Sequence, residues 1–494
     1  MVKPASAKWT SVASIYATAL FGGLLCLWAI TRYGQQIPLS DSATAAGSSI
    51  VIGKAQPLLE AISGELRKNF ASPFGSLILQ ILTILVASRL CGVVLKRLGQ
   101  PRVMGEIIAG ICLGPSLLGV LLPEVRGFLF PESALPQLFF LSNVGLILFM
   151  FMIGLELDLK SLATRAKSAL LISHLSIIVP FVLGAALALV LFDQYAPHQF
   201  GFLSFALFMG VSMSVTAFPV LARIIQEHHL TRTTLGAAAI TSAAIDDVSA
   251  WCILAVVVGI VQSGSSTGAV GVLSLALVYT GLAIFAVRPA LKRWLPTSAV
   301  GSPRIAPAKL AVVFMILLTS CLLTESIGIH ALFGAFLAGV IMPEEGAFKA
   351  KLVASVEDVS TLVLLPLFFA FTGLRTEIGL LNDVNGWLIC GLIIVVAVAG
   401  KMGGSIAGAR WTGLDWRESA GLGALMNTRG LVELVVLNIG YDIGILTPKI
   451  FTMLVIMAIV TTMMTGPLLR LFGIVGAKVA ALDDMRTDDI PRAA

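Results

Sequence analysis

Charged residues are scarce in this sequence: Asp, Glu, Lys and Arg make up only 12% of its 494 residues. Soluble proteins of this length usually carry about 25% charged residues. Apolar residues instead reach 57%, which is more than a water-soluble fold needs for its core. The composition therefore excludes an ordinary soluble protein and predicts an integral protein that crosses the lipid bilayer many times.

Other absences narrow the function further. All six cysteines fall inside predicted membrane spans, so no disulfide framework is expected. No Gly-x-x-x-x-Gly-Lys-Ser/Thr loop occurs, which excludes a pump driven by ATP bound in such a loop. The net charge of +6 is spread over short loops, and no stretch is basic enough to indicate a nucleic-acid partner. We expect neither a cofactor nor an enzymatic activity.

Long apolar runs fill most of the chain. A helix needs about 20 mainly apolar residues to cross a bilayer, and runs of that length predict an all-α fold with about fourteen transmembrane helices. They lie near residues 11–31, 75–96, 103–121, 137–157, 168–192, 200–225, 233–262, 266–288, 308–326, 330–342, 355–376, 385–410, 418–441 and 448–472.

Lys and Arg are distributed unevenly between the predicted loops. Residues 288–309 contain Lys and Arg without a single acid, whereas residues 193–199 and 262–267 contain no Lys or Arg. Short loops rich in Lys and Arg stay in the cytoplasm. With an even number of spans, both termini are then expected to be cytoplasmic, in the inner (plasma) membrane of a bacterium.

Two predicted spans contain helix-weakening residues at comparable positions. The run from Gly210 to Pro219 places a proline in the middle of a span, where it removes a backbone donor and frees the carbonyl of Val215. The run from Gly421 to Gly430 concentrates glycines and polar side chains. Backbone groups freed at this depth must be buried in protein or line a cavity, so both runs indicate a functional site.

The two breaks also indicate an internal duplication. Residues 75–262 and 308–472 would each form a unit of helices whose fifth member is broken, joined by a linker helix at 266–288. Two such units separated by one span have opposite orientations, which is the inverted repeat of secondary transporters. Residues 1–74 would then form an additional N-terminal membrane anchor with an external loop, and residues 473–494 a short cytoplasmic tail.

Two adjacent acids, Asp246 and Asp247, lie inside the apolar run Leu235–Gly259. A charge near the bilayer centre costs about 2.5–3.5 kcal/mol on insertion scales, so such acids face protein or water and indicate an ion or proton path. Neighbouring helical residues point about 100° apart. The two carboxylates are therefore expected to have different surroundings and different roles.

Several segments resemble the monovalent cation:proton antiporter-2 family, which includes bacterial Kef-type and GerN-type antiporters and plant cation/H+ exchangers. They occur in comparable order over residues 75–470. The matching segments are Gln100–Gly110, Gly114–Gly119, Phe151–Glu156, Ser214–Pro219, Ala244–Val248, Pro366–Gly373 and Asn427–Glu433.

The resemblance implies a NhaA-like fold with two crossed discontinuous helices, a dimerisation domain and a mobile core domain. It also implies a homodimer that exchanges Na+ or K+ for H+. Asp247 matches the carboxylate that binds the ion and the proton, and Asp246 precedes it. Lys401 occupies the position at which the electrogenic sodium–proton members have a lysine paired with the first acid.

The chemistry of these residues suggests a division of roles. We assign Asp246 to Lys401, whose ammonium group keeps that carboxylate ionised, and Asp247 to the transported ion. Na+ and K+ are hard cations that prefer oxygen ligands. The hydroxyls of Thr216 and Ser214 are therefore expected to complete the shell, with Asp247 and Thr216 as metal ligands.

Three further residues are expected to support this site. Asn427 lies in the second broken span and is expected to act indirectly. Arg429 and Glu433 are spaced i, i+4 on one helix face, where opposite charges pair. A structural ion pair is the simpler interpretation, and a role of this pair in proton access stays open.

Two other functions are compatible with the sequence. A sodium-coupled organic-anion symporter with a related inverted repeat would share the topology, and uptake of an organic substrate without acid movement would favour it. A channel-like or sensor protein could keep the fold without exchange. Replacement of Asp247 by Asn distinguishes a channel-like or sensor protein from an exchanger, because the substitution removes the titrating group that exchange requires.

Overall fold

The computed structural model describes residues 69–70, 72–156, 166–230, 233–263, 266–294, 305–343 and 346–474. Over these residues the chain is helical and contains no strand, as predicted. Ten described helices are long and apolar enough to cross a membrane, and two shorter apolar helices lie at Phe202–Ser214 and Ala331–Val340. The predicted total of about fourteen spans is not confirmed: the span at 11–31 lies outside the described residues, and the spans at 200–225 and 418–441 are each divided.

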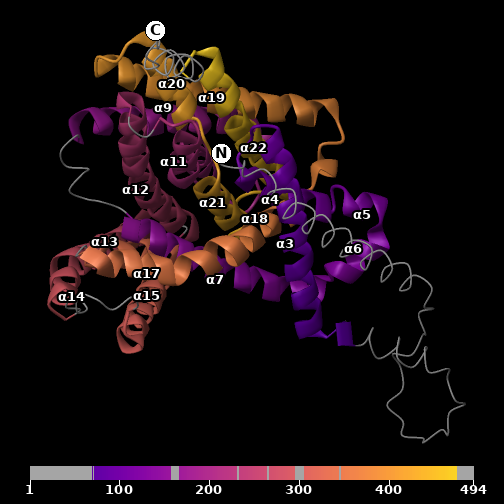
Figure 1. The fold of residues 1–494 in the computed structure, drawn as a ribbon. Coiled ribbons are helices and arrows are strands. Elements are labelled where there is room, and N and C mark those ends of the chain that lie inside the picture. Colours follow the sequence, from indigo (N-terminus) through magenta and orange to yellow (C-terminus); the bar gives the residue numbers. More distant parts are fainter. Residues whose placement is uncertain are drawn as a thin grey trace, which may run out of the picture.

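Figure 1 shows the arrangement of the helices along the chain. In order, the described elements are α3 (Pro73–Arg97), α4 (Arg102–Leu113), α5 (Leu118–Leu121), α6 (Pro123–Leu129), η1 (Glu132–Ala134), α7 (Leu135–Glu156), α9 (Ala166–Tyr195), α10 (Phe202–Ser214), α11 (Phe218–Glu227), α12 (Thr234–Ser263), α13 (Ser266–Leu282), η2 (Ala283–Val287), α14 (Arg288–Trp294), α15 (Pro307–Ile327), α16 (Ala331–Val340), α17 (Gly346–Val359), η3 (Ser360–Leu364), α18 (Leu365–Leu374), η4 (Ile378–Leu380), α19 (Val384–Trp411), α20 (Trp416–Met426), α21 (Leu431–Asp442) and α22 (Pro448–Leu471).

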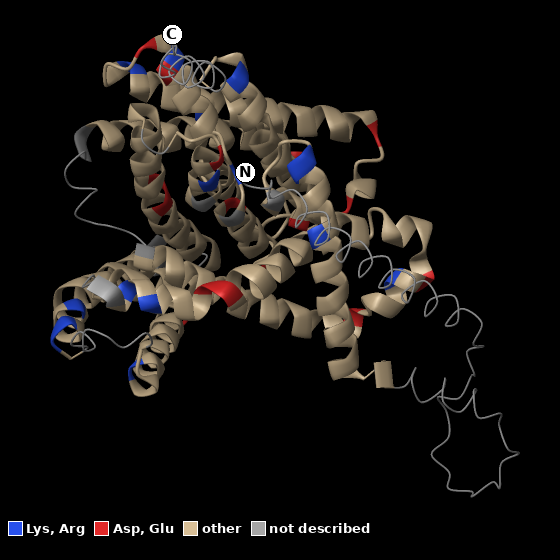
Figure 2. Cartoon of the chain, in the orientation of Figure 1, with Lys and Arg blue, Asp and Glu red and all other residues tan. Residues whose placement is uncertain are grey.

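Local sequence signals set several helix ends. Asp383 caps α19, because its side chain accepts a hydrogen bond from the backbone amide of Gly386 at 3.2 Å. Pro307 occupies the first turn of α15, where a missing backbone donor costs nothing. Gly328 ends the same helix with φ of 91°, a left-handed conformation that glycine adopts without strain. Along the helices charged residues are sparse, and most of the ribbon in Figure 2 is uncharged.

The helices pack as two groups. The core group contains α9–α12 and α19–α22, in which α9 and α19 lie against each other and α10 and α20 pack beside them. The scaffold group contains α3, α4, α7 and α15–α18, in which α4 packs on α18 and α7 on α16. Helix α13 contacts α12 of the core group and α15 of the scaffold group. In Figure 1, α9, α19 and α20 lie in the upper part of the view and α7, α15 and α17 in the lower part.

Two close helix contacts in the scaffold group occupy corresponding positions in the two predicted repeats. Gly110 of α4 lies against Ala370 of α18 so closely that an added Cβ would be 2.1 Å from the Ala370 carbonyl oxygen. Gly154 of α7 is as close to Phe336 of α16, again 2.1 Å from added Cβ to carbonyl oxygen. Each contact joins the second helix of one predicted repeat to the third helix of the other, as expected for units related by an axis in the membrane plane. The boundaries of those repeats stay a prediction.

Candidate ion-binding site

The two predicted broken spans are interrupted in the structure, and their interruptions meet. Residues 215–217 separate α10 from α11, and residues 427–430 separate α20 from α21. The backbone amide of Ala217 donates to the carbonyl of Thr428 at 3.1 Å. The two breaks therefore touch in the interior of the core group, which is the crossing of discontinuous helices that was expected.

The position of the first break differs slightly from the sequence prediction. Pro219 lies in the first turn of α11, not within a continuous helix, and a proline there sacrifices no intrahelical hydrogen bond. Val215 is extended, with φ of −70° and ψ of 139°. The helix is thus interrupted by an extended segment, and the proline begins the second half-helix.

Lys401 of α19 reaches the first break from the side. Its Nζ lies 2.8 Å from Oδ2 of Asp246 and donates to the carbonyl oxygen of Ser176 at 3.0 Å. The same group donates to the Ser214 carbonyl at the end of α10. Both charged side chains are fully buried. The structure therefore places Lys401 and Asp246 in direct contact, as the sequence predicted, and removal of either partner would leave an uncompensated buried charge.

The two predicted hydroxyl ligands are engaged elsewhere in this conformation. The Thr216 hydroxyl donates to Oδ2 of Asp246, and its role as a cation ligand beside Asp247 stays a prediction. The Ser214 hydroxyl donates to the Val211 carbonyl within α10 at 2.9 Å. Sequence reasoning located these residues at the break but did not foresee which carboxylate Thr216 meets.

Asp247 has different surroundings from its neighbour, as expected. It is only 3% exposed, and neither of its carboxylate oxygens has a hydrogen-bond partner of normal geometry among the described residues. The backbone amide of Phe218 lies near it in the first turn of α11, and the N-terminus of a helix favours a negative charge. Asn427, at the second break, is fully buried, and its amide atoms also have no partner in the described part of the chain. Buried polar groups are usually paired, so Asp247 and Asn427 have hydrogen-bonding capacity left for a ligand.

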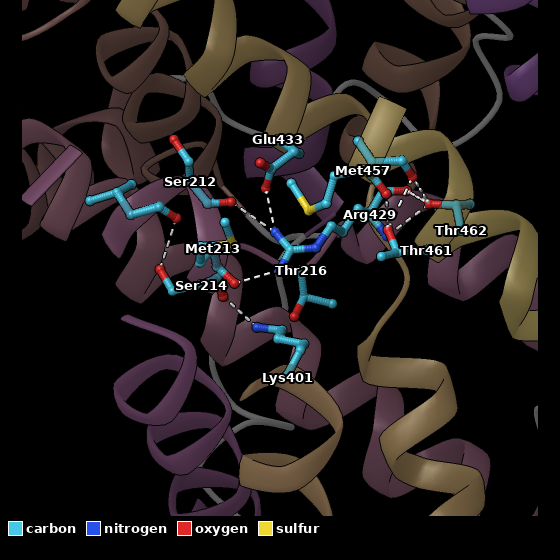
Figure 3. Close-up of polar contacts among 12 residues, drawn as sticks. Ser212, Met213, Ser214, Thr216, Lys401, Arg429, Glu433, Met457, Thr461 and Thr462 are labelled. Carbon is cyan, nitrogen blue, oxygen red and sulfur yellow. Dashed lines mark hydrogen bonds and ion pairs between the residues drawn. The ribbon is translucent and has the colours of Figure 1, made fainter. Parts of the chain in front are cut away.

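Arg429 lies at the second break and forms hydrogen bonds with the helix end at the first break, as Figure 3 shows. Its Nη1 donates to the carbonyl of Ser212 at 2.8 Å, and its Nη2 donates to the carbonyl of Met213. These carbonyls belong to the last turn of α10, whose groups have no intrahelical partner. Nη1 also lies 2.9 Å from Oε2 of Glu433, in a fully buried pair. The ion pair predicted from the i, i+4 spacing is formed, and it also positions Arg429 as a cap for α10.

Two polar contributors were not found from the sequence. Ser176 of α9 accepts the hydrogen bond from Lys401, and the Thr462 hydroxyl of α22 accepts one from the backbone amide of Arg429 at 3.0 Å. Single Ser and Thr residues are common in membrane helices and carry no signal alone. The glycine at position 404 was a usable sequence signal of close helix packing. In the structure, an added Cβ on Gly404 would lie 2.3 Å from the backbone of α9, and this close approach brings α9 beside the site.

The chain resembles known transport proteins over most of its length. Residues 81–473 match the family described as sodium/hydrogen exchanger, transmembrane. The Na+/H+ antiporter NhaS4 of Synechocystis sp. is 43% identical over 389 residues, covering 78% of this chain and 95% of that protein. The Na+/H+-K+ antiporter GerN of Bacillus cereus is 31% identical over 395 residues, covering 79% of this chain and 95% of that protein.

A plant relative is longer than this chain. Cation/H+ antiporter 19 of Arabidopsis thaliana is 40% identical over 417 residues, which cover 83% of this chain and 51% of that protein. This chain thus spans about half the length of that relative.

A solved structure supports the fold. The sodium proton antiporter MjNhaP1 of Methanocaldococcus jannaschii superposes with a TM-score of 0.58 at 16% sequence identity, covering 83% of this chain and 98% of that chain. The helical architecture expected from the sequence is therefore confirmed, as is the resemblance to cation/proton antiporters. The chain belongs to the sodium/hydrogen exchanger family of integral membrane antiporters.

Proposed function

We propose that this cation/proton antiporter exchanges Na+ or K+ for H+ by alternate binding of the cation and the proton to Asp247. One observation carries the assignment: Asp247 is buried beside the first break, and its carboxylate oxygens have no hydrogen-bond partner of normal geometry among the described residues, with the Phe218 amide nearby. Its neighbour Asp246 is occupied by Lys401 at 2.8 Å. Of the two acids, Asp247 is thus the one free to take a ligand.

The cation would be held by oxygen atoms near the first break. We propose Asp247 and Thr216 as metal ligands, supported by Ser214 and Asn427. The Thr216 hydroxyl uses its proton for Asp246, but a hydroxyl oxygen keeps lone pairs that can coordinate a cation. The contact with Asp246 thus orients the Thr216 oxygen and is compatible with a ligand role. Arg429 and Glu433 hold the backbone of the break in place and are not proposed as ligands.

Antiport then follows from competition for one carboxylate. A proton and a cation each neutralise Asp247, and each excludes the other. Movement of the core group with a bare carboxylate would carry an unpaired charge through a dry interface, which is costly at membrane depth. The core group therefore crosses with either ion bound, and exchange results.

Replacement of Asp247 by Asn tests this assignment. We expect the variant to lose cation-driven proton movement in sealed proteoliposomes, because the amide neither titrates nor neutralises a cation. Wild-type protein assayed with Na+, K+, Li+ and Rb+ in turn, at a set membrane potential, identifies the cation. Asp193→Asn is the matched control, since Asp193 is exposed at the end of α9. Undiminished exchange by a folded Asp247→Asn protein would show that the ion binds elsewhere.

The alternative of a sodium-coupled organic-anion symporter is not supported. The relatives are named as antiporters of Na+, K+ or other cations with H+. No observation at the site favours an organic substrate.

We also propose a homodimer in the inner (plasma) membrane of a bacterium, with both termini in the cytoplasm. Basic residues support this orientation, because α3 ends with Lys96 and Arg97, and α19 and α22 carry Arg410 and Arg470 in their last turns. Short basic segments mark the cytoplasmic side of a membrane protein. The dimer follows from the family resemblance, and cross-linking in native membranes would test it.

A further inference from the structure

The segment that follows α18 connects the scaffold group to the core group. On the scaffold side it is held by Ser116, whose hydroxyl donates to the carbonyl of Thr376 at 2.7 Å. The same hydroxyl oxygen accepts a hydrogen bond from the backbone amide of Ile378 at 2.9 Å. On the core side, the amide of Glu377 donates to the Thr452 hydroxyl of α22 at 3.1 Å. The segment therefore bridges the two groups of helices.

Side chains of α18 and α21 form the strongest part of this bridge. Arg375 Nη1 lies 2.7 Å from Oδ1 of Asp442, with side-chain exposures of 20% and 36%. It also donates to Oδ1 of Asn438 at 3.1 Å. The Asn438 side-chain amide in turn donates to the Thr372 hydroxyl at 2.8 Å. Arg375 and Thr372 belong to the scaffold group, whereas Asn438 and Asp442 belong to the core group.

Aromatic rings hold the guanidinium group in this position. The Cζ of Arg375 lies 4.5 Å from the ring centroid of Phe371, 4.9 Å from that of Phe139 and 5.2 Å from that of Tyr441. These separations fit cation–π attraction. Because Phe139 and Phe371 are scaffold residues and Tyr441 is a core residue, the guanidinium lies between surfaces of both groups.

A small cavity lies beneath this network, between the core group and the scaffold group. Its lining includes Asn143 of α7, Phe368 of α18, Val435 and Asn438 of α21, and His330, which caps α16. Polar groups inside a membrane protein face other polar groups or water and mark routes for ions. Most of the lining is apolar, and its polar side chains are Ser142, Asn143, His330, Asn438 and Asp442.

Three residues of the cavity lie along α21, whose other end begins beside the second break. Val435, Asn438 and Asp442 are spaced i, i+3 and i+7, so they lie on one face of α21. From Asp442 to Val435 this face extends about 10 Å at 1.5 Å per residue. Val435 is one turn from Leu431, where α21 begins beside the second break.

We propose that the contacts joining Arg375 and Thr372 to Asp442 and Asn438 form a gate that closes the ion route at this membrane face. The proposal rests on the proposed function, because a gate is needed only if the core group moves against the scaffold group. A shift of α21 past α18 by one helical turn, about 5.4 Å, separates every pair in the network and opens the cavity. When the contacts re-form, the site is closed from that face.

A cross-link tests whether the contacts must break. Thr372→Cys combined with Asn438→Cys, in a background without the six native cysteines, places two thiols where polar atoms now lie 2.8 Å apart. We expect oxidation to abolish exchange in proteoliposomes and dithiothreitol to restore it. Each single-cysteine variant is a control that oxidant should not affect. Equal exchange before and after a cross-link verified by mass spectrometry would overturn the gate.

A labelling measurement tests the gate independently of exchange. Val435→Cys places a thiol in the cavity, and an impermeant thiol reagent is applied to each side of sealed vesicles. Adding Asp442→Asn should raise the labelling rate from one side by about fivefold, as expected for loss of a partly exposed ion pair. Lys449→Gln is the matched control: it removes a 3.1 Å pair with Asp383 that lies within the core group, so labelling should not change.

The two measurements separate the two proposals. Unchanged labelling in Asp442→Asn would contradict the gate, whatever the transport activity. Absence of coupled exchange in the wild-type chain would contradict the proposed function. An increase in labelling together with redox-controlled exchange would support both.

Discussion

Lys401 and Arg429 are two buried cations that cap the same helix end but pair with different carboxylates. Both donate to carbonyls in the last turn of α10, which have no partner within that helix. Lys401 also pairs with Asp246, beside the proposed ion ligand, whereas Arg429 pairs with Glu433. We infer that Lys401 belongs to ion exchange and Arg429 to the architecture of the break.

Replacement of Arg429 by Lys should lower the free energy of unfolding by about 1–3 kcal/mol, since one ammonium group cannot reproduce a fork that meets two carbonyls and a carboxylate. Thermal unfolding in detergent measures this. Arg223→Lys is the control, because Arg223 and Glu227 form an exposed pair at 3.2 Å and such pairs contribute little. Equal losses of unfolding free energy in both variants would show that the capping contacts of Arg429 do not stabilise the fold.

Lys401→Gln should change how exchange responds to voltage. If Lys401 releases its proton during the cycle, wild-type exchange moves net charge, and the Gln variant should exchange without dependence on membrane potential. Rates measured at several potassium-diffusion potentials in proteoliposomes check this. The same voltage response in both proteins would exclude Lys401 as a second proton carrier.

Among the helices, close backbone contacts pack the scaffold group tightly. Gly154 of α7 brings that helix against Phe336 of α16, with 2.1 Å between an added Cβ and a backbone oxygen. The interface therefore has no room for any side chain at this position. In the core group, the paired half-helices leave their ends at the centre of the protein, where charged side chains and a bound ion can satisfy them.

Gly154→Ala should separate α7 from α16 and destabilise the protein by about 1–3 kcal/mol, the usual cost of overpacking. Gly271→Ala on α13 is the matched control, because an added Cβ there meets no atom within 4 Å. Thermal unfolding of both variants gives the comparison. A melting temperature for Gly154→Ala equal to that of Gly271→Ala would contradict the close packing described above.

For the protein as an exchanger, the proposed mechanism makes the cation and the proton compete for Asp247. As the pH falls, protons occupy a larger share of the site, so more cation is needed to displace them. The apparent KM for the cation should then rise by up to about tenfold per pH unit in the acidic range. Fluorescence-based exchange assays across a series of pH values measure this. A KM that does not change with pH would show that the ions bind at separate sites.

The membrane class, the two breaks and the paired acids could be predicted from the amino-acid sequence, because they depend on composition and on local helix chemistry. Most of the contacts between distant polar groups became visible once the helices were seen packed together. The family resemblance anticipated that Lys401 reaches Asp246 across 155 residues, but nothing in the sequence indicated that Arg429 reaches the end of α10 across 217. Such contacts arise when separate helices pack side by side. For the same reason the sequence did not foresee the partner of Thr216 or the bridge between α18 and α21.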